Sequence, residues 1–471
     1  MSRFLVLYGM FLLIFFVLSF FSYNAYHLGY AHLNLLFYAE KVLLAREGDP
    51  PRLENIGFVY PPLAFLPFWI VKDYLLVSPM VSAFVLTAFL SFLLRRCQAP
   101  VYALLILLLL NPLLLFLAVY RFEVLTFYLL LTMSLVMLIL HMEKGYTLYL
   151  FVGGFLFGLC FFLDFRSLFL TPFLAFAIYL STKQESSGYR WALMIVKLSL
   201  IIFFSLAWLY LNWIFTESPF TFITSPYSFF KSEPIDPSVL SVRGNLLKVL
   251  EYTTLKLLNY LPLILPYLLV LFSLRKYRYI YLTPVYLVYL SPVILIMLSV
   301  YFSTFFPAYY HTVLFLLFAI TFQASFGIKA SRFLLLAFIL SFLSSWLLPL
   351  FSKEENEKNF VKFLITGEIK GNLEEYKKVA QVLKDCNKVL IDDAGGFPIV
   401  YLVRDPKKFY LPYMYEYYTV LSYPEIFADC LLVDKANAND KVMMRFPKAG
   451  MGFLKGYSLV YEGETYNVFR R

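Results

Sequence analysis

Long, uninterrupted runs of apolar residues recur along the chain and constrain its fold more than any other feature. Runs such as 4–21, 101–120 and 333–351 approach the roughly 20 residues that a helix needs to cross about 30 Å of hydrocarbon. The strands of a membrane β-barrel would instead alternate apolar and polar residues, which these runs do not. Because only 15% of the 471 residues are charged and 61% are hydrophobic, a soluble enzyme is excluded. We therefore expect an α-helical polytopic membrane protein.

Positively charged residues indicate which loops face the cytoplasm, because Lys and Arg concentrate in cytoplasmic loops. Here they occur in alternate loops: Arg3; Arg95 and Arg96; Lys144; Lys183 and Arg190; Arg275, Lys276 and Arg278; Lys329 and Arg332. About eleven spans are then expected, at 4–22, 78–95, 101–119, 125–141, 147–163, 168–182, 191–214, 253–274, 280–301, 309–326 and 333–351. Arg3 places the N-terminus on the cytoplasmic side of the inner or plasma membrane, and an odd number of spans then places the C-terminus outside.

Two properties that suggest other classes of protein have simpler explanations. The formal net charge of +10 does not indicate nucleic-acid binding, since the basic residues lie mostly in the loops between spans. The first apolar run has no small-residue cleavage site after it, so we expect it to be a retained anchor and not a signal peptide.

The sequence divides into a transmembrane domain, 1–352, and a soluble extracytoplasmic domain, 353–471, in which charges are frequent. Two outer loops, 23–77 and 216–250, belong to the first domain. The apolar segment 61–71 is too short to span and is expected to lie in the outer interface, as is a helix at 33–44. In the second domain we expect helices at 372–386 and 396–403, buried strands at 388–392 and 430–434, and a hairpin over 457–470. This order predicts a small α/β layer structure.

Short motifs beside the membrane carry the candidate chemistry. The first outer loop contains Tyr38-Ala39-Glu40, Gly48-Asp49, Arg52-Leu53 and Tyr60-Pro61-Pro62-Leu63, and Arg121-Phe122-Glu123 directly follows the third expected span. Together these motifs resemble those of GT-C fold glycosyltransferases that use polyprenyl-phosphate sugars, especially the aminoarabinose lipid A transferases and relatives of the protein O-mannosyltransferases. The first 180 residues or so resemble the family in their motifs. The rest of the chain resembles it only in its architecture, with about eleven spans, a large outer loop at 216–250 and an outer C-terminal domain.

The resemblance implies a donor and an acceptor. The donor would be a polyprenyl-phosphate-linked sugar and the acceptor a lipid, a glycan or a protein. No cofactor is assigned, and a divalent metal remains open. Moving the sugar requires a carboxylate to take the acceptor proton and cations to stabilise the phosphate leaving group. Glu40 and Glu123 are therefore the candidate catalytic residues, and the candidate substrate-binding residues are Asn34, Tyr38, Tyr60, Lys72, Arg121, Arg166, Tyr310 and His311.

The chain also departs from the family pattern. The family has an Asp about four residues before the tyrosine of Tyr-Ala-Glu, where this chain has Asn34, and an amide cannot act as a base. A lysine common near the outer end of the fifth span is replaced by Asp164. Either the acid role has moved, most plausibly to Glu40, or the chain binds a polyprenyl lipid without catalysis.

Each candidate also has a structural alternative. Glu40 can belong to the solvated face of an amphipathic helix, paired with Lys41 or Lys72, and Glu123 can form a structural ion pair with Arg121. Tyr310 and His311 can belong to an interfacial aromatic belt. A secondary transporter is a third function class, but internal repeats and charges within spans, which transporters show, are scarce here.

The cysteines give one further expectation. Cys386 and Cys430 lie at the starts of the two buried strands. Parallel strands joined by a helix are often neighbours, so their Cα atoms can come within the roughly 4.4–6.8 Å of a disulfide. An extracytoplasmic location would allow the bond to form, and a reduced, buried pair is the alternative.

Overall fold

The structure is a computed structural model that describes residues 2–94, 105–182, 186–225, 228, 237–276, 282–304, 308–328 and 331–471. The chain forms two compact units, each discontinuous in sequence. Unit 1 comprises Met1–Phe20, Phe58–Ala64 and Ser78–Gly367, and unit 2 comprises Phe21–Gly57, Phe65–Val77 and Glu368–Arg471. The spatial grouping thus differs from two consecutive blocks, because most of the first outer loop packs with the C-terminal residues.

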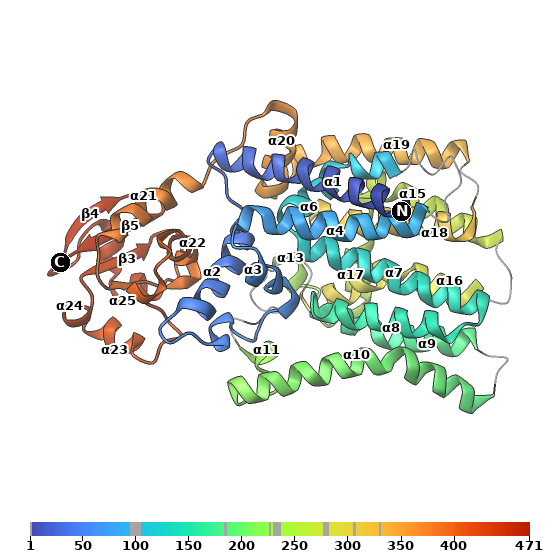
Figure 1. Cartoon of the computed structure of the whole chain (residues 1–471), viewed down its shortest axis with the longest axis horizontal. Helices are drawn as coiled ribbons and strands as arrows, with labels where there is room; N and C mark the ends of the chain where they lie inside the picture. Colours follow the sequence, from blue (N-terminus) through green and yellow to red (C-terminus); the bar gives the residue numbers. More distant parts are fainter. Residues whose placement is uncertain are drawn as a thin grey trace. The chain divides into compact units, whose positions relative to one another are not determined.

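Unit 1 is helical, and its long apolar helices lie side by side in Figure 1. Helix α7 packs against α8 and α18, α8 against α10, and α15 against α18 and α19. The helices are α1 (Ser2–His27, which continues into unit 2), α4 (Tyr74–Leu94, which begins in unit 2), α6 (Pro112–Tyr120), α7 (Phe122–Lys144), α8 (Thr147–Phe161), α9 (Thr171–Ser181), α10 (Ser187–Thr216), α11 (Thr221–Thr224), α13 (Pro237–Leu240), α14 (Leu246–Asn259), α15 (Leu261–Ser273), α16 (Leu282–Tyr289), α17 (Ser291–Tyr301), α18 (Thr312–Phe326), α19 (Arg332–Leu347) and α20 (Glu355–Thr366). Short 3₁₀ helices are η2 (Pro62–Ala64), η3 (Phe165–Leu170), η4 (Leu274–Lys276), η6 (Tyr309–His311) and η7 (Leu348–Phe351).

Six helices in the described residues are long and apolar enough to cross a membrane, and two bent pairs raise the number to eight. The six include α1, α4, α7 and α10, together with the segments Tyr309–Phe326 and Arg332–Phe351. The chain therefore has the composition and helices of a membrane protein. Three of the eleven expected spans correspond to shorter apolar helices: residues 105–109 with α6, helix α8, and η3 with α9. The described residues therefore contain fewer than eleven full-length spans.

Proline explains where several expected spans are broken. Helices α14 and α15 meet at an angle of 105°, and α16 and α17 meet at 56°. Pro262 and Pro292 lie in the first turns of α15 and α17, where a residue without an N–H begins a helix well but cannot continue the preceding one. Pro112 begins α6 in the same way after Asn111, whose side chain accepts hydrogen bonds from the backbone N–H of Leu113 and Leu114.

Unit 2 is an α/β structure around a five-stranded sheet with strand order β2-β1-β3-β5-β4 (Figure 1). Strands β1 (Val389–Leu390), β2 (Phe409–Tyr410) and β3 (Cys430–Asp434) are parallel, whereas β4 (Ser458–Glu462) and β5 (Tyr466–Arg470) form an antiparallel hairpin against β3. The helices are α2 (Leu33–Glu47), α3 (Leu66–Ile70), α21 (Leu373–Lys384), α22 (Asp393–Val403), α23 (Tyr417–Ser422), α24 (Pro424–Phe427) and α25 (Lys441–Arg445), with the 3₁₀ helices η1 (Leu53–Ile56), η8 (Pro406–Lys408) and η9 (Pro447–Met451). The expected α/β character of this region is confirmed, but β2 was not expected.

The two faces of the sheet form separate hydrophobic cores. Along β3, Cys430 and Leu432 belong to one core, and Leu431 and Val433 belong to the other, as the alternation of a strand requires. The first core includes residues of α21 and α22 and also Leu44 of α2. Helix α2 packs against α22 and is therefore part of the unit 2 core, although about 350 residues of sequence separate the two helices.

The expected disulfide is present in unit 2. Cys386 and Cys430 are bonded, with a Cα–Cα distance of 6.1 Å. Val389 is in register with Cys430 on the neighbouring parallel strand, which brings Cys386, just before β1, close to its partner.

Candidate functional site

Helix α2 organises the candidate site of unit 2. Its sequence has no Gly or Pro between Leu33 and Glu47, and it ends at Gly48, where the backbone N–H donates to the carbonyl of Leu44. A Cβ added at Gly48 would lie 2.4 Å from that carbonyl oxygen. Glycine is therefore required at this tight exit, which is followed directly by Asp49-Pro50.

Glu40 is completely buried on α2 and belongs to a small charged cluster. Its Oε2 lies 3.4 Å from Nζ of Lys41, which donates at 2.6 Å to Oδ2 of Asp393 at the start of α22. Burial raises the pKa of Glu40 to about 8; Lys41 opposes this shift and Asp393 adds to it. A carboxyl group that changes protonation near neutral pH can both accept and release a proton.

A basic pocket, defined by Arg46, Lys72 and Arg404, lies along the same helix, and Ala39 lines it whereas Glu40 does not. It has a volume of 90 Å³, and its other lining residues are Ala39, Val42, Leu43, Glu47, Phe68, Val71 and Tyr401. The Arg404 guanidinium lies 4.0 Å from the centre of the Tyr401 ring. Within the described residues, neither Arg46 nor Lys72 is within 4 Å of a carboxylate, so their charges remain available to an anion.

The short helix α3, next to Lys72, exposes large apolar side chains. Leu66, Trp69 and Ile70 have exposed fractions of 53%, 37% and 78%. The sequence predicts an interfacial helix at 61–71, and the structure has a helix within this range. Exposed apolar residues next to a cation suit the boundary between lipid and water.

The other two predicted residues on α2 occupy different surroundings. Tyr38 packs its ring against Phe65 and Phe68 of the α3 region, with ring centres 5.1 and 6.0 Å apart. Asn34 is half-buried in the first turn. The predicted substrate contacts of Tyr38 and Asn34 remain predictions.

Unit 1 brings together five predicted site residues: Arg121, Glu123, Arg166, Tyr310 and His311. Arg121 ends α6 and precedes α7, and its Nε donates to Oε1 of Glu123 at 2.6 Å. Glu123 lies in the first turn of α7, where the helix dipole favours a carboxylate. Its Oε2 is buried and accepts no hydrogen bond from the residues that the structure describes. The ion pair expected as the structural alternative is thus formed, but it leaves one carboxylate oxygen unsatisfied.

Arg166 has most of its donors engaged. Its Nε and Nη2 donate to Asp164 at 3.0 and 2.7 Å, and Nη1 donates to the carbonyl of Thr304 at 3.0 Å. The pair lines a cavity of 30 Å³ with Tyr128 and His311, whose hydroxyl oxygen and Nδ1 are 2.5 Å apart. This volume holds a water molecule but not a sugar.

Glu357 joins this group and was not expected from the sequence. Its carboxylate accepts hydrogen bonds from the backbone N–H groups of Tyr309 and Tyr310, and the Tyr310 ring centre lies 5.7 Å from the Arg121 guanidinium. Burial raises the pKa of Glu357 to about 8, although both hydrogen bonds and Arg121 oppose the shift. Its sequence context, the acidic start of a helix after the last span, resembles an ordinary solvated helix end and gives no signal.

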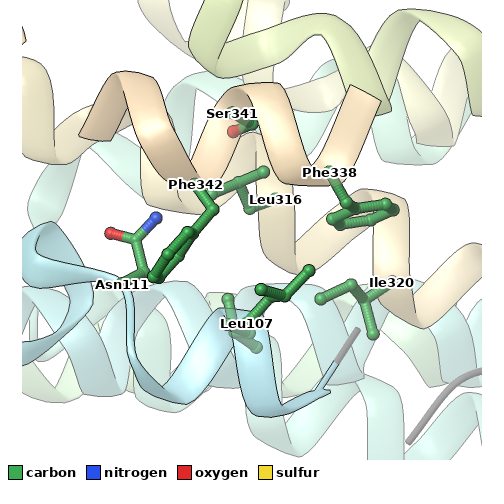
Figure 2. Close-up of a pocket in the computed structure, with 8 residues that line it drawn as sticks. Leu107, Asn111, Leu316, Ile320, Phe338, Ser341 and Phe342 are labelled. Atoms are coloured by element: carbon green, nitrogen blue, oxygen red, sulfur yellow. The ribbon is translucent and has the colours of Figure 1, made fainter. Parts of the chain in front are cut away.

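A second cavity in unit 1 is a gap in packing. Figure 2 shows apolar side chains of α18, α19 and residue 107 around a common space. This space has a volume of 10 Å³. Its polar members are used internally: Asn111 caps α6, and Ser341 donates to the carbonyl of Leu263. The cavity is too small and too apolar for a substrate.

Several other candidates lie apart from these clusters. Tyr60 is half-buried in unit 1, just before η2, and its substrate role remains a prediction. Part of the outer loop 216–250 lies outside the described residues. So do five of the basic residues that predict the cytoplasmic loops: Arg95, Arg96, Lys183, Arg278 and Lys329. Within the described ranges, no group of three or more His, Cys, Asp or Glu side chains is arranged to hold a metal ion.

Comparisons with known proteins do not extend these observations. No model of a protein family, no curated protein and no solved structure matches the chain. The resemblance to GT-C glycosyltransferases therefore depends on the motifs of the sequence alone.

Proposed function

We propose that the chain is an integral membrane glycosyltransferase of the GT-C type. It would move a sugar from a polyprenyl-phosphate donor to a lipid, glycan or protein acceptor at the outer face of the membrane. The observation that supports this most is the arrangement on α2, which holds a buried carboxyl group with a pKa near neutral and also lines a basic pocket next to exposed apolar side chains.

These groups suit the two halves of the reaction. Glu40 would take the proton from the acceptor hydroxyl as its oxygen forms a bond to the anomeric carbon. The bond between that carbon and the phosphate oxygen breaks, and its electron pair leaves with the polyprenyl phosphate. Arg46, Lys72 and Arg404 would stabilise the negative charge that develops on this leaving group, and Trp69 and Ile70 would contact its lipid chain.

Within unit 1, Glu123 of the Arg121–Glu123 pair is a separate candidate for the carboxylate of the reaction. The unsatisfied Oε2 of Glu123 can accept a hydrogen bond from a substrate hydroxyl or a bound water molecule. Arg166 suits a supporting role, because Asp164 and Thr304 already engage its donors.

Transfer of a labelled sugar from polyprenyl phosphate by the purified full-length protein tests this proposal. Glu40→Gln and Glu123→Gln should each reduce the rate by about 10²-fold or more, which is the lower range for loss of a general acid–base group. Arg46→Met and Lys72→Met should weaken donor binding. Glu143→Gln, at the exposed end of α7, and Lys248→Met, on α14, are matched controls that should leave the rate unchanged. Full activity in both glutamine variants would reject the catalytic assignments.

The proposal includes an orientation in the cell membrane. The N-terminus would be cytoplasmic and residues 353–471 extracytoplasmic, with eleven spans that include the shorter helices and the bent pairs. The Cys386–Cys430 disulfide supports this, because disulfides persist mainly in oxidising compartments.

A non-catalytic carrier of polyprenyl lipids is the second candidate, and Asn34 favours it. A carrier would use the basic pocket and α3 but would not need a base. Asn34→Asp separates the two functions. If wild type already transfers sugar, the carrier is rejected; if it binds polyprenyl phosphate without transfer and Asn34→Asp gains activity, the chain is a relative that has lost catalysis.

A further inference from the structure

Unit 2 also contains a cavity of 510 Å³ that the proposed transfer reaction does not use. Three segments of the unit line it: the loop after α2, the residues that precede β1 and β2, and β2 with the loop that follows it. The lining residues are Asp49, Pro50, Arg52, Glu54, Asn55, Lys388, Lys407, Phe409, Tyr410, Tyr413, Met414, Tyr415 and Glu416. Its volume lies within the range of pockets that bind small molecules.

The walls of this cavity are held in place by hydrogen bonds and packing. The buried Asn55 side chain donates to the carbonyls of Leu44 and Pro50, at 3.0 and 3.1 Å, and so holds the loop 49–55 against the end of α2. On the opposite side, Phe409 is buried in the core of the sheet. Lys388 donates to the carbonyl of Lys407 at 2.9 Å and lies over the Tyr410 ring. Hydrogen bonds and packing within unit 2 therefore fix the shape of the cavity.

The charges that line the cavity balance. Three carboxylates, Asp49, Glu54 and Glu416, face three cations, Arg52, Lys388 and Lys407. A site for a polyanion such as nucleic acid or a phosphate cluster would have an excess of positive charge. Equal numbers of acceptors and donors suit a neutral ligand with many hydroxyl groups, because carboxylates accept from hydroxyls and cations donate to hydroxyl and ring oxygens.

Exposed aromatic rings at the cavity indicate which neutral ligand fits. Tyr415 is 98% exposed and Tyr413 is 40% exposed, although both are large rings that would normally be covered. A tyrosine ring offers an apolar face for stacking and a hydroxyl for hydrogen bonds. A pyranose ring has a matching shape, with an apolar face of C–H groups and a rim of hydroxyls.

We propose that this cavity binds a neutral saccharide, with the rings of Tyr413 and Tyr415 stacked on sugar faces and the charged side chains bonded to hydroxyl groups. The cavity lies wholly within unit 2, and the inference does not depend on the transfer reaction proposed above. A saccharide can bind here whether or not the chain transfers sugar, so binding and transfer assays can fail separately.

Binding of neutral oligosaccharides by the full-length protein in detergent tests the inference. The probes are arrayed short oligosaccharides of hexose and N-acetylhexosamine, with acidic and basic peptides and polyphosphate beside them. We expect binding of one or more oligosaccharides, with little change between low and high salt because the ligand is uncharged. Tyr415→Ala and Tyr413→Ala should each weaken this binding by about tenfold, the upper range for one stacked ring, and Tyr415→Trp should retain it.

Tyr418→Ala is the matched control, because Tyr418 is also an exposed tyrosine of this region but does not line the cavity. Since Tyr415 is almost fully exposed, its loss should leave the melting temperature unchanged, and weaker binding then reports the contact and not the fold. The inference is overturned if no neutral oligosaccharide binds, if binding is the same in the Tyr413 and Tyr415 variants as in wild type, or if only peptides bind in a manner that depends on Tyr415.

Discussion

Glu40 shows how burial changes the pKa of a single carboxyl group at a cost in stability. Its carboxyl group is removed from water, which favours the neutral form, and Lys41 offsets this effect only in part because it also pairs with Asp393. A carboxylate in solution would be fully ionised at neutral pH and a poor proton donor. Burial on α2 therefore gives Glu40 a property that neither its sequence position nor the presence of Lys41 would indicate.

The pKa of Glu40 predicts a pH dependence of stability. The pKa rises from 4.5 in the unfolded chain to about 8 in the folded one. Below pH 4.5 both states are protonated, so the group has no effect. Between pH 4.5 and 8 the unfolded state ionises first, and stability falls as pH rises. At pH 9, Glu40→Gln should therefore melt at a higher temperature than wild type, and its free energy of unfolding should be larger by on the order of a few kcal/mol. At pH 5 the two proteins should melt at a similar temperature.

Comparison of wild type with Glu40→Gln isolates this effect, because the other buried glutamate with a raised pKa, Glu357, is present in both proteins. A melting temperature that differs by the same amount at pH 5 and pH 9 would contradict the prediction. Since the variant should be more stable at high pH but slower in transfer, a loss of activity could not be ascribed to misfolding.

At the scale of elements, α2 is the helix on which unit 2 depends. It supplies Leu44 to the core of the sheet, Glu40 and Lys41 to the charged cluster, and Arg46 to the basic pocket. A helix from the segment between α1 and α4 thus completes a domain whose sheet is built from the C-terminal residues.

Leu44→Ala tests whether α2 belongs to this core. The side chain is fully buried, so its truncation should destabilise unit 2 by about 2–5 kcal/mol. Hydrogen exchange of the full-length protein should become faster in β1 and β3, whose side chains share the same core. Leu33→Ala, at an exposed position of the same helix, is the control and should leave exchange unchanged. Unaltered exchange in Leu44→Ala would show that α2 folds apart from the sheet.

Local patterns predicted the elements of unit 2 better than their grouping. The helix at 33–44 and the strand at 430–434 follow from apolar spacing and from a buried run between polar residues, and both are observed. Strand β2 was missed because two residues carry no periodicity. The contact of α2 with α22 could not be predicted, since apolar spacing shows that a helix has a buried face but not what covers it.

In the candidate site, too, contacts between residues close in sequence were predicted, whereas tertiary contacts were not. The ion pair of Arg121 and Glu123, which the sequence offered as the structural alternative, is formed, because the two residues are close in sequence and lie at a helix start. The catalytic role that the motif indicates for Glu123 stays a prediction. Asp393 and Glu357 were missed, because each enters its cluster through a tertiary contact and looks like an ordinary acidic residue at the first turn of a helix.

At the scale of the whole molecule, the disulfide connects the fold to the cell compartment. Cys386–Cys430 should form in the protein as the cell makes it, so alkylation of the denatured protein without reductant should label Cys160 but not Cys386 or Cys430. After reduction Cys386 and Cys430 should be labelled as well. Equal labelling of Cys386 and Cys430 in both samples would show that no bridge forms.

The number of spans decides on which side of the membrane unit 2 lies. In the part of the chain that the structure describes, six single helices and two bent pairs give up to eight full-length spans, and an even number would leave both termini on the same side. If the shorter helices α6, α8 and α9 also cross, the number is eleven and the termini are on opposite sides. The disulfide favours eleven, because a cytoplasmic unit 2 would be kept reduced.

A reporter that is active only in the cytoplasm distinguishes the two counts. Fused after Arg471, it should be silent, because an odd number of crossings carries the C-terminus outside. Fused after Gly145, in the loop that contains Lys144, it should be active, since positively charged short loops stay in the cytoplasm. A signal from the C-terminal fusion would mean that the shorter helices do not all cross. Unit 2, with Glu40, the basic pocket and the saccharide cavity, would then face the cytoplasm, and transfer at the outer face would be ruled out.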